Sequence, residues 1–194
     1  MRAPPPSRAG RRQQGATLIE ILVSMIILML GLLGLVGVMV QSQRAQLESY
    51  QRVQALLIVQ DMVSRINTNR AAADCYVQAG ALGTGNAATP DASACTSGTA
   101  GQRTRVTQDL VEWKALLLGS AEVSGGSSVG AILGARGCIT KDNATGIFQV
   151  SVAWQGIQAV GAPPAGITCG SGQYGTDDAQ RRAVSVTILP AVSS

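Results

Sequence analysis

An uninterrupted apolar run constrains this 194-residue chain more than any other feature. Residues 21–40 contain no charged side chain, and the next charge after them is Arg44. A helix rises about 1.5 Å per residue, so a run of this length spans the roughly 30 Å hydrocarbon core of a bilayer. The sequence therefore predicts a helix that crosses a membrane.

The charges before this run predict its orientation. Arginines stand at positions 2, 8, 11 and 12, and no acidic residue occurs before Glu20. An excess of arginine keeps its side of a membrane helix in the cytoplasm. We therefore expect a cytoplasmic N-terminus, with everything after Val40 on the opposite side of the membrane.

A secretory signal peptide is the first alternative for this segment. Its cleavage site would follow the apolar region with an A-x-A pattern, whereas residues 41–46 read QSQRAQ. The small residues Gly15 and Ala16 precede the apolar region instead. A twin-arginine signal is also disfavoured, because Arg11-Arg12 is followed by Gln-Gln-Gly and the apolar segment is very hydrophobic.

Glu20 lies at the edge of the apolar run, where a carboxylate needs a reason. An acidic side chain costs roughly 2.5 to 3.5 kcal/mol at the bilayer centre on insertion scales, and less toward the interface. At the level of the lipid headgroups Glu20 would need no partner. In the functional interpretation it neutralises a cation of a neighbouring subunit, and cleavage between Gly15 and Ala16 would create one, a new α-amino group.

The residues around Gly15 resemble a known family of signals. An arginine-rich leader, Gly15 and then ATLIEILVSMIILMLGLLGL are similar to the class III signals of type IV prepilins and pseudopilins, in which G-F-T-L-I-E precedes an apolar helix. The resemblance implies removal of residues 1–15 by a prepilin peptidase, N-methylation of Ala16, and a role for Glu20 in subunit docking. The family most often has Phe or Met where Ala16 stands, which bears on methylation more than on cleavage.

The same resemblance implies partners and a location. The expected partners are the prepilin peptidase, other major and minor pilins, an inner-membrane assembly platform and membrane lipid. The subunit is expected to wait in the inner membrane as a single-pass protein with a periplasmic head. It then enters the pilus and reaches the cell surface.

Periodicities after the apolar run predict a helix and then a small sheet. No Gly or Pro occurs in residues 44–66, and Leu56, Val59, Val63 and Ile66 have the spacing of one helical stripe. Alternating apolar residues predict strands at 148–154 and 184–188, with a further strand within 129–139. The predicted sheet is mostly antiparallel and packs on the stripe.

These elements define an α+β fold, which is also what the resemblance to type IV pilins implies. The expected organisation is a leader at 1–15, a long N-terminal helix at 16–72 that is transmembrane from about 18 to 40, and an extracytoplasmic head at 73–194.

Residues 79–117 predict a loop followed by a short surface helix. Residues 79–101 are rich in Gly, Ala, Thr and Ser and have no periodicity, which predicts a long loop. Leu110, Trp113 and Leu117 then follow at helical spacing, with Asp109 and Glu112 placed like a capping box. We expect the tryptophan to face inward.

Four cysteines lie in the predicted head: Cys75, Cys95, Cys138 and Cys169. An even number in an oxidising compartment predicts disulfides. Three pairings are open, and we favour the pairs that join Cys75 to Cys95 and Cys138 to Cys169, since each closes a loop. Each bond would contribute roughly 3 to 4 kcal/mol in the chain-entropy model. A zinc site is disfavoured, because the chain has no C-x-x-C pair and no His.

Charge and composition argue against other functions. Four of the 15 basic residues lie in the predicted leader, which leaves the mature chain nearly neutral, and paired arginines such as 103/105 and 181/182 are usually solvated, so a nucleic-acid partner is not expected. The absence of His excludes Ser-His-Asp and Cys-His catalysis. For Asp177-Asp178 a solvated turn is favoured over a calcium site. We expect no enzyme, no metal and no cofactor.

Three functions remain open. The first is a minor pilin that primes or assembles a type IV pilus and serves twitching motility, adhesion or DNA uptake. Spaced residues of the head resemble PilV-type pilus modification subunits: Asp109-Leu110 with Trp113, Trp154, and Arg181 before a strand leading to Pro190. The second is a type II secretion pseudopilin. The third is an uncleaved single-pass anchor whose exported domain binds a ligand.

Overall fold

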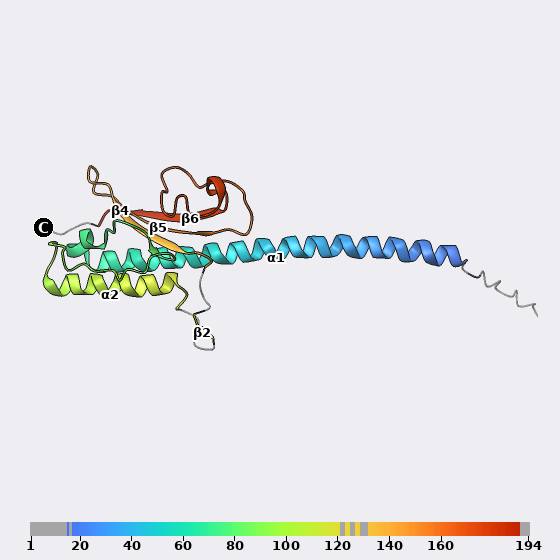
Figure 1. The fold of residues 1–194 in the computed structure, drawn as a ribbon, viewed down its shortest axis with the longest axis horizontal. Helices are drawn as coiled ribbons and strands as arrows, with labels where there is room; N and C mark the ends of the chain where they lie inside the picture. The colour runs from blue at the N-terminus through green and yellow to red at the C-terminus, as the bar shows by residue number, and fades with distance from the viewer. Residues whose placement is uncertain (1–14, 16, 121–122, 125–126, 129–131, 191–194) are drawn as a thin grey trace, which may run out of the picture. The chain divides into compact units, whose positions relative to one another are not determined.

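The computed structural model describes residues 15, 17–120, 123–124, 127–128 and 132–190 (Figure 1). The predicted leader up to residue 14 and Ala16 lie outside the described residues. The molecule divides into two compact units, Met1–Arg44 and Ala45–Ser194, and each is described by itself.

The helix α1 runs from Leu18 to Thr68, which confirms the long N-terminal helix. In the first unit every large apolar side chain of α1 is exposed. An 18-residue window of this helix has a mean hydropathy of 2.8 and is nowhere buried, so by length and composition α1 can cross a membrane.

In the second unit one stripe of α1 enters the core. Ala55, Val59, Met62 and Ile66 are fully buried, whereas the predicted stripe members Leu56 and Val63 pack at the margin of the core. The predicted stripe is therefore in the right place, but its centre lies one residue toward the N-terminus at two of its four positions.

A short 3-10 helix and a second α-helix follow α1. The 3-10 helix η1 spans Arg70–Tyr76, and α2 spans Ala100–Leu117. The predicted start of α2 at Asp109 is wrong, because Thr99 and Gln102 form the capping box: the Gln102 N–H donates to Thr99 Oγ1 and the Thr99 N–H donates to Gln102 Oε1. Asp109 lies mid-helix and is buried.

The head contains a four-stranded antiparallel sheet in the order β1-β4-β5-β6. Its strands are β1 Leu82–Gly83, β4 Arg136–Lys141, β5 Phe148–Gln155 and β6 Arg181–Ile188. A separate two-stranded hairpin joins β2 Val123–Ser124 to β3 Ser127–Ser128. A short 3-10 helix, η2, spans Thr176–Asp178. The α+β class and the two C-terminal strands are as predicted.

One strand prediction and one loop prediction need correction. The strand expected within 129–139 begins at Arg136, because residues 132–135 form a turn in which the Ala135 N–H donates to Ile132 O and Gly134 has φ +66°; residues 129–131 lie outside the described part. The expected loop at 79–101 contains β1, and its last two residues, Ala100 and Gly101, already belong to α2.

The strand β5 is buried on both faces, although its alternation predicted one exposed face. Phe148, Val150, Val152 and Trp154 belong to the main core with α1 and α2. On the opposite face Ala153 packs with Cys169 and Tyr174. Cys169 and Tyr174 belong to the segment that connects β5 to β6, residues 156–180. We call it the covering segment, because it folds back over the sheet (Figure 1).

Candidate functional site

The N-terminal end of α1 carries the residues predicted to matter most. The Thr17 carbonyl accepts the N–H groups of Glu20 and Ile21, at 3.0 and 3.3 Å, which starts the helix. Glu20 therefore lies in the first turn, where a carboxylate interacts favourably with the helix dipole. Its side chain is exposed, and it forms no ion pair within the described part of the chain.

The predicted cleavage site is accessible on one side. Gly15 is exposed, and a Cβ added to it would have no neighbour within 4 Å. The geometry of Ala16 lies outside the described residues, so N-methylation and the docking of Glu20 stay predictions.

The apolar surface next to Glu20 has no cover within its own unit. Exposed fractions of its large side chains include 77% for Leu18 and 42% for Val40. An exposed apolar patch of this extent marks a surface that faces lipid or another protein.

The four cysteines form two disulfides in the pairing that we favoured. Cys75 is bonded to Cys95 with a Cα–Cα distance of 5.5 Å, and Cys138 is bonded to Cys169 at 5.7 Å. The second bond ties β4 to the covering segment. It therefore helps to hold that segment over the outer face of β5.

Asp178 and Arg181 form a buried ion pair, which corrects the expectation of solvated residues at both positions. Arg181 Nε lies 3.0 Å from Asp178 Oδ2, and its Nη1 donates to the carbonyls of Ile167 and Cys169. The Gly172 N–H, the Ser171 hydroxyl and Arg181 hold the pKa of Asp178 below its usual value. The carboxylate is thus occupied in anchoring the covering segment.

The predicted arginine pair of α2 is also engaged within the head. Arg103 Nη1 donates to Gly98 O at 2.8 Å, and Arg105 Nε lies 3.0 Å from Asp109 Oδ1. Each of the two guanidinium groups therefore contacts an acceptor within the head.

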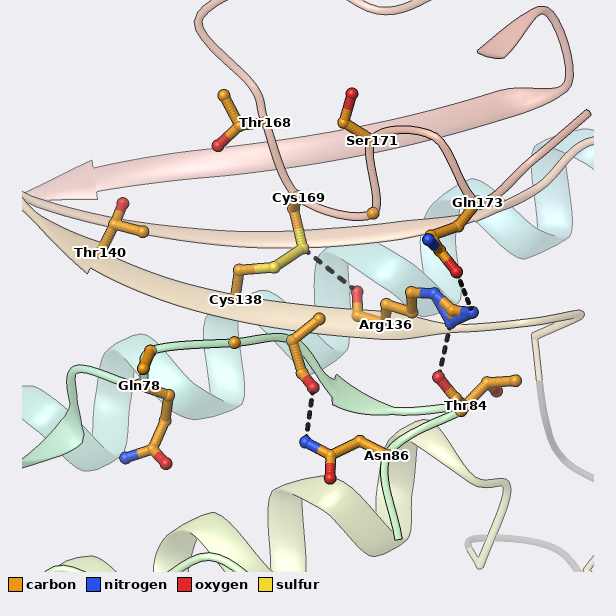
Figure 2. Close-up of a pocket in the computed structure, with 15 residues that line it drawn as sticks. Gln78, Thr84, Asn86, Arg136, Cys138, Thr140, Thr168, Cys169, Ser171 and Gln173 are labelled. Atoms are coloured by element: carbon orange, nitrogen blue, oxygen red, sulfur yellow. Dashed lines mark hydrogen bonds between the residues drawn. A yellow bond between two sulfur atoms is a disulfide. The ribbon is translucent and has the colours of Figure 1, made fainter. Parts of the chain in front are cut away.

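A polar hollow of about 400 Å³ lies beside the second disulfide (Figure 2). Arg136 stands at one end of it, where Nη1 donates to Thr84 O at 2.5 Å and Nη2 donates to Gln173 Oε1 at 3.1 Å. The guanidinium carbon lies 5.6 Å from the ring centroid of Tyr174. Burial raises the pKa of Tyr174 to about 12. Its hydroxyl therefore stays protonated and donates to Gly134 O. Sequence analysis missed this hollow, because no local pattern links residues from three separate segments.

Comparison with known proteins addresses the N-terminal segment. A family model described as the prokaryotic N-terminal methylation motif matches residues 10–36, which include Gly15, Ala16 and Glu20. Neither a curated protein nor a solved structure matches the chain significantly.

The motif and the fold support one class of protein. The match supports a type IV prepilin-like protein, of the group that includes pilins and pseudopilins. The motif implies processing by a prepilin peptidase and assembly with other pilins. Together with the exposed apolar helix, the motif supports a membrane-anchored, pilin-like protein.

Proposed function

We propose that this chain is a minor pilin subunit of a type IV pilus, with a structural role and no catalytic one. The observation that carries the proposal is the N-terminal unit of α1. There a fully exposed apolar surface begins with a first-turn carboxylate that has no ion-pair partner among the described residues. Together with the methylation motif, this surface is suited to packing against equivalent helices.

The mechanism follows from the two environments that the helix must occupy. In the membrane, lipid covers the apolar surface of α1. During assembly, contacts with like helices replace those with lipid. Cleavage after Gly15 supplies the one cation that this apolar surface lacks.

Glu20 then acts on the axial register of the subunits. A carboxylate and an amine attract each other strongly in an apolar medium, since the effective dielectric constant there is far below that of water. A helix that slips along its neighbour leaves both charges unpaired, which is costly. We propose that Glu20 of one subunit pairs with the Ala16 amine of the next.

The head supports the finer assignment to PilV-type subunits. The residues of that resemblance build the fold: Trp113 Nε1 donates to Ile58 O at 2.9 Å, Trp154 lies in the core, and Arg181 anchors the covering segment. Because the residues that carry the resemblance also hold this head together, the resemblance favours a head fold in common with PilV-type subunits.

The intact mass of the protein tests the class. We would recover it from membranes of a host with a prepilin peptidase and of the same host without one. The expected result is loss of residues 1–15 only when the peptidase is present, with or without a methyl group on Ala16. Full-length protein in both hosts would overturn the proposal and leave a plain membrane-anchored domain.

The pilus assignment needs a second measurement. In the native host, the mature chain should be found at low abundance among sheared pili, and its deletion should reduce surface piliation. Normal piliation together with loss of protein secretion would instead identify a type II secretion pseudopilin.

A further inference from the structure

We propose that the polar hollow of the head binds an acidic saccharide, a short oligomer that contains uronic acid. This proposal concerns the head alone and does not depend on the assembly of the subunit. The argument rests on how the hollow is built, what lines it, and where its charge lies.

The hollow forms where the sheet is incomplete. The strand β1 pairs with β4 only through Leu82 and Gly83. Before β1, the chain also contacts β4 at Gln78, whose N–H donates to Ile139 O at 3.3 Å. Residues 79–81 between these contacts line the hollow. The opposite wall consists of residues 168–171 and Gln173, which face them across β4 (Figure 2).

Both walls are fixed before any ligand arrives. The Cys138–Cys169 disulfide joins β4 to the far wall. The buried carboxylate of Asp178 accepts hydrogen bonds from the Gly172 N–H and the Ser171 hydroxyl. On the near wall, Asn86 Nδ2 donates to Ala81 O at 2.8 Å. A preformed site loses little conformational entropy on binding.

The polar side chains of the lining are mostly hydroxyls and carboxamides. The lining contains four hydroxyl side chains and three carboxamides, which come from Thr84, Thr140, Thr168, Ser171, Gln78, Asn86 and Gln173. The rest of the described lining consists of two alanines, three glycines, Arg136 and the two cysteines of the disulfide. Hydroxyls and carboxamides both donate and accept hydrogen bonds. They match a ligand that is polar over its whole surface, as a polyhydroxylated sugar is.

Arg136 adds one positive charge at the end of the hollow. Of its five N–H donors, two are used by Thr84 O and Gln173 Oε1 among the described residues. The ring of Tyr174 and these two acceptors hold the guanidinium in place. A Cβ at Gly85 would lie 3.1 Å from Arg136 Nη2, so glycine at this position, with φ +80°, keeps the group uncrowded.

No acidic side chain of the described lining compensates this charge. The carboxylate of Asp178, which contacts the lining through the Ser171 hydroxyl, is paired with Arg181. A held guanidinium with free donors recognises carboxylates well, because its planar fork matches their two oxygens. The site thus combines hydroxyl recognition with carboxylate recognition, and a volume of about 400 Å³ lies within the usual range of ligand sites.

The test uses the full mature chain in a detergent micelle. The detergent must not be a glycoside, since its headgroup would compete. Isothermal titration would compare tri-galacturonate, the neutral trisaccharide of galactose, and acetate. We expect tri-galacturonate to bind at least about tenfold more tightly than the neutral sugar, the loss that one charge-assisted contact produces, and acetate not to bind at matched concentration. Equal binding of both sugars, binding of acetate alone, or no binding of tri-galacturonate would each overturn the proposal.

Matched variants place the ligand in the hollow. Thr140 and Thr168 are exposed and make no side-chain hydrogen bond among the described residues. Thr140→Val and Thr168→Val keep shape and should each weaken tri-galacturonate binding about three- to tenfold. Thr187→Val is the control, since Thr187 is exposed on β6 and outside the lining. Binding unchanged in both lining variants, or weakened as much by the control, would refute the site.

Arg136→Lys tests the guanidinium. It keeps the charge but removes the fork, so we expect affinity to fall tenfold or more. Because Arg136 also contacts Thr84 and Gln173, its fold would be checked by near-UV circular dichroism, and the two threonine variants carry the conclusion if the fold changes. Parent-like affinity in folded Arg136→Lys would contradict recognition by the guanidinium.

Discussion

Arg65 on α1 and Asp109 on α2 form an ion pair with 2.9 Å between Nη1 and Oδ1, although 44 residues separate them in sequence. The Asp109 side chain is only 2% exposed. It also accepts a hydrogen bond from the Tyr76 hydroxyl at 2.5 Å and lies 3.0 Å from Arg105 Nε. Three elements, α1, η1 and α2, therefore meet at one carboxylate.

The electrostatics agree with this geometry. Burial alone would lower the pKa of Arg65, but its hydrogen bonds to Glu112, Asp61 and Asp109 outweigh burial and raise it. Burial, and then the bond to Asp109, raises the pKa of Tyr76. Arg65 is therefore charged and Tyr76 is protonated at neutral pH.

Removal of the Asp109 carboxylate should destabilise the head strongly. Asp109→Ala leaves the Tyr76 hydroxyl without its buried acceptor, whereas Arg65 keeps Asp61 and Glu112. An unsatisfied buried donor costs about 1 to 3 kcal/mol of unfolding free energy. Denaturant unfolding, followed by the fluorescence of the buried Trp113, would measure the change.

Glu112 provides the matched control for Asp109. It binds the same guanidinium, but its side chain is 57% exposed. Exposed ion pairs contribute only about 0 to 1 kcal/mol, so Glu112→Ala should be nearly neutral. Equal losses in the two variants would show that burial does not set the strength of this contact.

A methyl group at Gly137 should disrupt the packing of α2 on the sheet. A Cβ there would lie 2.6 Å from Trp113 Cζ3 and 2.7 Å from Leu117 Cδ1. Overpacking of this kind costs about 1 to 3 kcal/mol. Gly137→Ala should therefore lower the melting temperature of the head, whereas Gly166→Ala, with no neighbour within 4 Å, should not. A parent-like melting temperature for Gly137→Ala would mean that Trp113 moves at no cost.

Asp178 should make the head sensitive to acid. Its pKa is lowered in the folded protein by the Gly172 N–H, by Ser171 and by Arg181. A depressed pKa contributes stability above the unfolded value of about 3.9, and that contribution is lost as the pH falls through the folded pKa.

Unfolding experiments between pH 7 and pH 2 would measure this effect. Asp178→Asn should lower stability at pH 7 and flatten its dependence on pH below about 4. Asp177→Asn is the control, since its neighbour's carboxylate makes the ion pair with Arg181. If the stability of Asp178→Asn depended on pH as that of the parent does, the effect would belong to another carboxylate.

Glu20→Gln should block assembly without blocking processing. The change removes the charge but keeps the size of a side chain that is exposed in the first turn of α1. Mature protein should accumulate in the membrane, and its amount in sheared pili should fall at least about tenfold, as expected for loss of a charge pair in an apolar medium. Glu20→Asp should retain part of the incorporation. Normal incorporation of Glu20→Gln would contradict the docking role.

Local patterns in the sequence predicted several elements correctly. Each correct prediction rests on a property of one element alone: the length of the apolar run, the stripe of α1, and the alternation at 148–154 and 184–188. The methylation motif likewise matches one contiguous segment, residues 10–36. The pairing of cysteines agrees because each favoured bond closes a short loop, with sequence separations of 20 and 31.

The start of α2 shows where such patterns fail. Asp109 and Glu112 have the three-residue spacing of a capping box, but residues three apart also share one face inside a helix. In the structure both contact Arg65. Thr99 and Gln102 have the same spacing and form the true cap. Spacing alone does not distinguish these cases, because the deciding partner is distant in sequence.

The sequence by itself determined the long apolar helix, the signal-like segment and the α+β order of elements, because hydropathy and periodicity act within one segment. Only the tertiary structure decided that Asp109 and Asp178 are buried partners of arginines, and that Arg136 lies in a polar hollow with Thr84 and Gln173. The burial and charge environment of a side chain depend on segments that folding brings together. Those environments therefore emerge only when the segments pack.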